Sequence, residues 1–78
     1  MKLDFLHPEY GIPCFAEWDE EGQVVLLDIQ NYDEAFENYP LEVVEEARRW
    51  CMRNGANCQN KEAANRHLAF LNIPSRFQ

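Results

Sequence analysis

The hydrophobic pattern of this chain changes its period near residue 31, and this change limits the folds that the chain can adopt. Before that point, short apolar stretches are separated by turn residues, as in consecutive β-strands. From Leu41 onward, apolar residues recur three and four positions apart, as they do on one face of a helix. A strand-forming half followed by a helical half predicts an α+β domain.

Residues 2–30 are predicted to form a three-stranded antiparallel meander. The second strand spans Ile12 to Trp18 and the third spans Gln23 to Gln30, and the polar loop Asp19–Gly22 between them has the composition of a tight hairpin turn. Positions 24–29 of the third strand are all apolar except Asp28. Because a strand buried on both faces reads as a continuous apolar run, we expect the third strand to be central or covered on both sides.

Residues 31–40 are predicted to be a turn segment, in which Asp33 can cap a single helical turn. A helix from Leu41 to Asn54 follows. Its first turns carry glutamates and its last turns carry arginines, an order that the helix dipole favours. Gly55 is the expected C′ residue that ends this helix.

A second helix is expected to begin at a cap supplied by Asn57 or Asn60 and to end near Leu71. Residues 41–71 then form a helical hairpin packed on one face of the meander, and residues 72–78 form a tail that Ile73 and Phe77 hold against the core. The whole chain, 1–78, is one small domain with a modest core. The residues expected to dominate that core are Trp18, Val25, Leu27, Ile29, Val44, Ala47, Trp50, Leu68 and Leu71.

Cysteine usage and hydropathy indicate a cytoplasmic protein. The longest aliphatic run, Val24–Leu27, is far shorter than the roughly 20 residues that span a membrane. No apolar leader is evident at the start, so neither a membrane location nor secretion is expected. In a reducing compartment Cys14, Cys51 and Cys58 are expected to act as small buried hydrophobes, and a pairing of Cys51 with Cys58 is left open.

Charge is divided unevenly along the chain, whose formal net charge is −7. Residues 1–47 hold 13 of the 14 acidic residues and a single lysine, whereas residues 48–78 hold the six remaining basic residues. The boundary falls inside the helix that begins at Leu41, so helix electrostatics explain much of the basic half. They do not explain the segment from Leu3 to Tyr39, which carries ten carboxylates and no lysine or arginine.

The unexplained acidic surface suggests a binding protein that occludes a basic protein surface on a nucleic-acid-handling complex. Closely spaced carboxylates can imitate the dense charge of a nucleic acid, and interleaved aromatic residues can anchor the contact. Small acidic proteins that phages use against restriction and CRISPR systems share this size and charge. The expected partner-binding residues are Asp19, Glu20, Glu21, Tyr32, Asp33, Glu34, Glu37, Tyr39, Glu42, Glu45 and Glu46.

Three other interpretations compete with this one. The acidic surface can serve solubility alone. The protein can be a structural or assembly subunit that docks through an apolar sheet face. Acidic and basic poles of two copies can also attract each other and give a homodimer. Direct nucleic-acid binding is not expected, because the net charge of −7 opposes a phosphate backbone.

Enzymatic activity, a cofactor and a metal are not expected from this sequence. His7, His67 and the three cysteines lack the spacing of standard zinc motifs. The three glycines are isolated, so no glycine-rich phosphate loop is present. Carboxylates are abundant, and for that reason no particular pair of them indicates hydrolytic chemistry.

Overall fold

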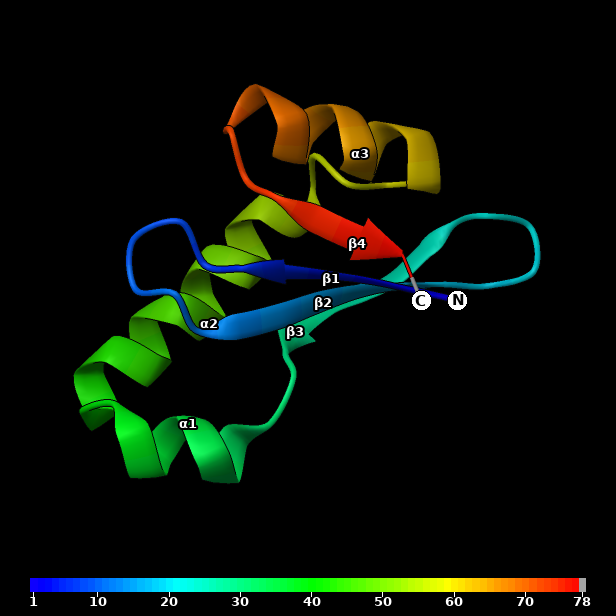
Figure 1. The fold of residues 1–78 in the computed structure, drawn as a ribbon. Helices are drawn as coiled ribbons and strands as arrows, with labels where there is room; N and C mark the ends of the chain where they lie inside the picture. Colours follow the sequence, from blue (N-terminus) through cyan, green and yellow to red (C-terminus); the bar gives the residue numbers. More distant parts are fainter. Residues whose placement is uncertain (78) are drawn as a thin grey trace.

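The computed structural model describes residues 1–77, and the side chain of Phe77 lies outside that description. The domain is α+β, with a four-stranded antiparallel sheet and three helices in this part of the chain (Figure 1). The elements in chain order are β1 (Lys2–Leu6), β2 (Pro13–Trp18), β3 (Val24–Ile29), α1 (Tyr32–Asn38), α2 (Leu41–Gly55), α3 (Lys61–Phe70) and β4 (Ser75–Phe77).

The sheet has the strand order β3-β2-β1-β4, so the three N-terminal strands form the predicted meander. Two expectations about it are wrong. The segment predicted as a simple tail supplies β4, which pairs antiparallel with β1 and places Arg76 opposite Asp4 (Figure 1). The apolar strand β3 is an edge strand rather than a central one. Its apolar composition instead reflects burial of one face against α2 and an irregularity in its pairing.

That irregularity is a β-bulge at Val25. Glu17 pairs with Leu26, but the next residue, Trp18, pairs with Val24, so Val25 has no partner on β2. The extra residue turns Val24 toward the core beside Trp18 and leaves Val25 63% exposed. The prediction that Val25 belongs to the core is therefore wrong, because the bulge interrupts the strict alternation of faces along β3.

The helices differ from the predicted ones mainly at their ends. Residues 32–38, expected as a turn with one helical turn, form α1, and its cap is Asn31 rather than Asp33. Gly55 is the last residue of α2 and has no positive φ, so it is not a C′ residue in the left-handed conformation. The chain instead continues in helical turns from Gly55 to Cys58, whose backbone N–H donates to the Gly55 carbonyl.

The connection between α2 and α3 is hydrogen-bonded to the β2–β3 hairpin. The predicted helical hairpin did not include these bonds. Asn60 caps α3 as expected, and its side chain accepts from the N–H of Ala63. Around it, the N–H of Val24 donates to Gln59, the N–H of Lys61 donates to Gly22, and Gln23 forms an isolated bridge with Asn60. The start of α3 is thus tied to the β2–β3 hairpin, and α2 and α3 are linked by a 2.8 Å hydrogen bond between His67 Nε2 and Asn54 Oδ1.

One core lies between the helices and one face of the sheet. Six of the nine predicted core residues are buried: Trp18, Leu27, Ile29, Val44, Ala47 and Leu68. Trp50 and Leu71 are half-buried at its margin, and Val25 is exposed. All three cysteines are buried free thiols, as expected for small hydrophobes. The Sγ atoms of Cys14 on β2 and Cys51 on α2 lie 3.9 Å apart, where the helix crosses the sheet closely.

The bulge makes opposite predictions for two neighbouring residues of β3. Leu27→Ala should lower the free energy of unfolding by about 2–4 kcal/mol because it opens a cavity in the core. Val25→Thr should change it by no more than about 0.5 kcal/mol because the side chain faces solvent and keeps its β-branch. Urea denaturation of the two variants measures both values, and a large loss for Val25→Thr would contradict the bulged register.

His7 is a buried polar residue in the loop between β1 and β2. Its Nδ1 accepts from the backbone N–H groups of Glu9 at 3.1 Å and Tyr10 at 3.2 Å, so the ring is neutral with its proton on Nε2. The ring stacks on Tyr10 and packs against Trp50. Burial lowers the pKa of His7 below its usual 6.5 and outweighs the nearby carboxylates of Glu9 and Glu46, which raise that pKa.

This lowered pKa predicts a loss of stability in mild acid. Below pH 6.5 the unfolded chain takes up a proton on His7 that the folded chain resists, so the free energy of unfolding decreases until the folded pKa is reached. The slope is at most about 1.4 kcal/mol per pH unit. His7→Asn retains an acceptor at the Nδ1 position without titrating there. Urea denaturation between about pH 7.5 and about pH 5.5 should give a flatter profile for this variant.

Candidate protein-binding site at the acidic corner

Helices α1 and α2 meet at Pro40 and present a group of exposed carboxylates together with exposed apolar side chains. We call this group the acidic corner, and it lies at one end of the molecule, drawn in green in Figure 1. Its members are Asp33, Glu34, Phe36, Glu37, Leu41, Glu42 and Glu45, all of which are exposed. Two apolar residues, Phe36 and Leu41, therefore lie among five carboxylates on adjoining helices.

Local sequence explains why the chain turns sharply here. The Asn31 side chain accepts from the Glu34 N–H at 3.0 Å and starts α1, and the N–H of Tyr39 donates to the Ala35 carbonyl and ends it. Pro40 then has φ −60, and its carbonyl accepts from Val43 and Val44 at the start of α2. The two helices are thereby joined by only two residues, which keeps the end of α1 next to the start of α2.

Tyr32 fastens α1 to the sheet. Its hydroxyl donates a hydrogen bond to the Asp28 carboxylate on β3, and its ring lies 6.2 Å from that of Phe36. Burial, followed by the hydrogen bond to Asp28, raises the pKa of the Tyr32 phenol, which therefore stays protonated. Tyr32 was predicted as a partner-binding residue, and in the structure its hydroxyl holds the site in place.

Glu46 differs from the other predicted carboxylates because it forms ion pairs with arginines of the same helix. Its two carboxylate oxygens lie 3.1 Å from Arg49 and 3.0 Å from Arg53. Hydrogen bonds from Arg53 and then Arg49 lower the pKa of Glu46. Among residues 1–77, none of the five carboxylates of the acidic corner forms such an ion pair.

The hairpin tip, Asp19–Glu21, is not brought to the acidic corner. The tip precedes β3 and Asn31 follows it, so the two lie at opposite ends of this strand (Figure 1). Six strand residues extend over about 20 Å. Asp19 also has a structural role, because its Oδ1 accepts from the N–H groups of Glu21 and Gln23. The predicted acidic surface is therefore divided between two ends of the molecule.

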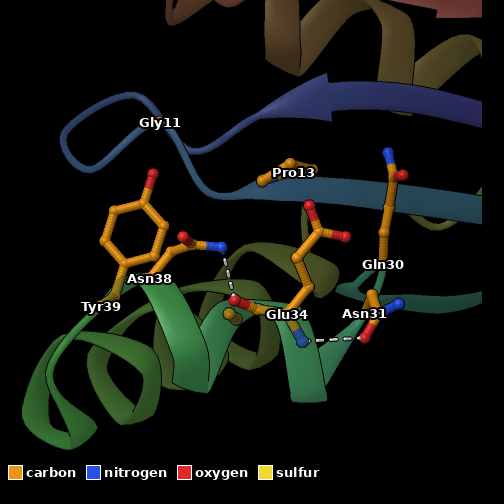
Figure 2. Close-up of a pocket in the computed structure, with 8 residues that line it drawn as sticks. Gly11, Pro13, Gln30, Asn31, Glu34, Asn38 and Tyr39 are labelled. Carbon is orange, nitrogen blue, oxygen red and sulfur yellow. Dashed lines mark hydrogen bonds between the residues drawn. The ribbon is translucent and has the colours of Figure 1, made fainter.

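A pocket of about 350 Å³ lies between α1 and the loop that leads into β2 (Figure 2). The Glu34 carboxylate and the Tyr39 hydroxyl both point from α1 and its end toward this loop. The lining residues are Gly11, Pro13, Gln30, Asn31, Glu34, Ala35, Asn38 and Tyr39. Of these, sequence reasoning selected only Glu34 and Tyr39. The sequence contains no signal that marks the other lining residues as part of a pocket, since nothing in it places residues 11–13 beside residues 30–39.

Comparisons with protein-family models, with curated proteins and with solved structures gave no significant match. Within the described part of the chain, no helix is both long and apolar enough to cross a membrane. No group of three or more histidine, cysteine or acidic side chains in residues 1–77 is arranged to hold a metal ion. The geometry and charge of the acidic corner are therefore the features of this protein that point to a function.

The Asn31 cap should matter more to this site than the carboxylate two residues later. Asn31→Ala removes the acceptor for the Glu34 N–H and should lower the free energy of unfolding by about 1 kcal/mol. Asp33→Asn keeps that cap and should cost less than about 0.5 kcal/mol. Amide hydrogen exchange should be faster at Ala35 and Tyr39 in Asn31→Ala only, since their N–H groups are bonded within α1 and at its end.

Proposed function

We propose that the protein is a non-enzymatic acidic binding protein that uses the acidic corner to occlude a basic surface on a nucleic-acid-handling protein. One observation carries this proposal: α1 and the first turns of α2, which meet at Pro40, carry five exposed carboxylates without ion pairs and the exposed side chains of Phe36 and Leu41. Carboxylates of this kind meet lysine and arginine side chains, and the two apolar side chains supply contact area that becomes buried on binding.

The helix dipole favours Asp33, Glu34 and Glu42 in the first turns of α1 and α2, but some of the five carboxylates repel one another. Asp33 and Glu37 are four residues apart on α1, and Glu42 and Glu45 are three apart on α2. Like charges at these spacings destabilise a helix by about 0.2–0.5 kcal/mol per pair. A cationic partner relieves this repulsion, and attraction between opposite surfaces also raises the rate of association. A protein surface dense in lysine and arginine is the electrostatic footprint of nucleic-acid binding.

The inhibitory mechanism in this proposal is competition. The acidic corner occupies the surface that the nucleic acid would otherwise contact, with carboxylates in the place of phosphates. This makes the protein a nucleic-acid mimic in charge, such as an inhibitor of a restriction or CRISPR system. The site needs no catalytic group, because occlusion depends only on affinity and position.

A second candidate function is a structural subunit that docks through the sheet face opposite the helices. Leu6 and Leu26 on that face are exposed, which favours a contact there. Charged residues of the same face, among them Lys2 and Glu17, interrupt the apolar area, and Lys2 lies over the Phe15 ring at 4.7 Å. A docking contact through this face would be weakly dependent on salt.

Two matched double variants test the proposed site. Glu37→Gln with Glu45→Gln removes two charges from the acidic corner, and Glu20→Gln with Glu21→Gln removes two from the hairpin tip. Each protein is used as bait in extracts of the native host, and captured proteins are identified by mass spectrometry. We expect a nucleic-acid-binding protein that the wild type and the tip variant retain and that the corner variant loses at least about tenfold.

The captured partner then allows a direct measurement of mechanism. Its association rate with the wild-type protein should fall steeply between about 0.05 M and about 0.5 M salt, and duplex DNA or RNA should compete for it. Equal retention of the partner by all three baits, with no competition by nucleic acid, would instead support docking through the sheet face.

A further inference from the structure

The pocket beside α1 contains two polar groups that the fold leaves unused. Asn31 and Glu34 have the spacing of a capping box, in which the glutamate side chain returns to the backbone N–H of the cap residue. Of the two hydrogen bonds of a capping box, only the one from the Glu34 N–H to Asn31 Oδ1 is formed. The Glu34 carboxylate instead points into the pocket toward Pro13 (Figure 2). It has no hydrogen bond or ion pair within residues 1–77.

Tyr39 supplies the second unused group at the other side of the same pocket. Its ring is half-buried against the core, and its hydroxyl points toward Gly11 (Figure 2). No hydrogen bond to this hydroxyl is made in the described residues. Between the two groups lies Asn38, whose Nδ2 donates to the Glu34 carbonyl at 2.8 Å and whose Oδ1 remains free to accept. The pocket thus offers a carboxylate, an amide oxygen and a phenol to one ligand.

We infer that this pocket binds the guanidinium group of an arginine side chain on the partner. This inference rests on the proposed function and names the residue type that the partner inserts. The planar guanidinium can donate two parallel hydrogen bonds to the Glu34 carboxylate and further bonds to Asn38 Oδ1. Its face can stack on the Tyr39 ring. The volume of about 350 Å³ is near the lower end of the range for small-ligand pockets.

Other ligand classes fit the pocket less well. An anion would meet the Glu34 carboxylate, and the pocket lining contains no lysine, arginine or histidine to offset that repulsion. A neutral apolar ligand would bury the carboxylate without a partner, which is costly. A lysine ammonium can pair with Glu34 but cannot stack on Tyr39 as a plane or form the two parallel bonds. Arginine is therefore the cation that can pair with Glu34, bond to Asn38 and stack on the Tyr39 ring at the same time.

Two pentapeptides of equal charge test the preference for arginine. One carries arginine between two lysines, each separated by glycine, and the other carries lysine in place of the arginine. Each is titrated into isotopically labelled protein at low salt, and amide chemical shifts give the affinity and the site. We expect the arginine peptide to bind at least about fivefold more tightly. The largest shifts should occur at Gly11, Asn31 and Tyr39.

Single substitutions test whether the preference for the arginine peptide depends on the pocket residues. Glu34→Gln should weaken the arginine peptide about tenfold because it replaces a charge-assisted pair. It should also reduce the difference between the two peptides to less than about twofold. Tyr39→Phe removes only the hydroxyl and should weaken the arginine peptide slightly. Glu20→Gln, at the hairpin tip, changes the net charge by the same amount as Glu34→Gln and should leave the preference for arginine intact.

The outcomes separate this inference from the proposed function. Equal binding of both peptides, with shifts spread over Glu37, Glu42 and Glu45, would overturn the arginine pocket and leave the acidic corner as a general cationic contact. Shifts confined to the hairpin tip, or none in the acidic corner at low salt, would overturn the proposed function together with the pocket. A preference for arginine that survives in Glu34→Gln would place arginine recognition elsewhere and would overturn the pocket alone.

Discussion

The close approach of α2 to the sheet is the contact on which the rest of this structure depends. Cys14 and Ala16 on the sheet and Ala47 and Cys51 on the helix are all buried. Because these side chains are small, the helix can lie near the strands, and the Cys14 and Cys51 sulfur atoms come within 3.9 Å. A larger residue at any of these positions would overpack the core. The position of α2 in turn determines where its N-terminus meets α1.

The acidic residues differ in whether their side chains bond to other groups of the described chain. Glu46 is held by Arg49 and Arg53 on α2, and Asp28 accepts from Tyr32 beside it. Asp19 shapes the hairpin turn through its own backbone contacts. After these roles are assigned, the carboxylates of the acidic corner remain without a structural partner in residues 1–77. Their presence on the same two helix segments as the exposed Phe36 and Leu41 is what supports a binding role.

Most of the fold could be predicted because its signals are local. The alternation in β1 and β2, the helical spacing after Leu41 and the Asn60 cap depend on residues within one or two turns of each other. The errors have a common cause in contacts between distant residues. The Val25 bulge depends on pairing with β2, and β4 exists because β1 offers a free edge to residues 75–77. The local pattern shows neither the shift in pairing at Val25 nor the pairing of residues 75–77 with β1.

In the candidate site too, some features follow from local sequence and others from contacts between distant residues. The sequence alone determined that a long acidic segment without lysine or arginine precedes a helix whose own charges follow its dipole. Only the tertiary structure decided which carboxylates gather. The rigid length of β3 keeps the hairpin tip away from α1, and the two-residue connection at Tyr39 and Pro40 brings α1 and α2 together. The pocket forms because the sheet places Gly11 and Pro13 beside α1, and a sequence carries no local record of a contact between segments about twenty residues apart.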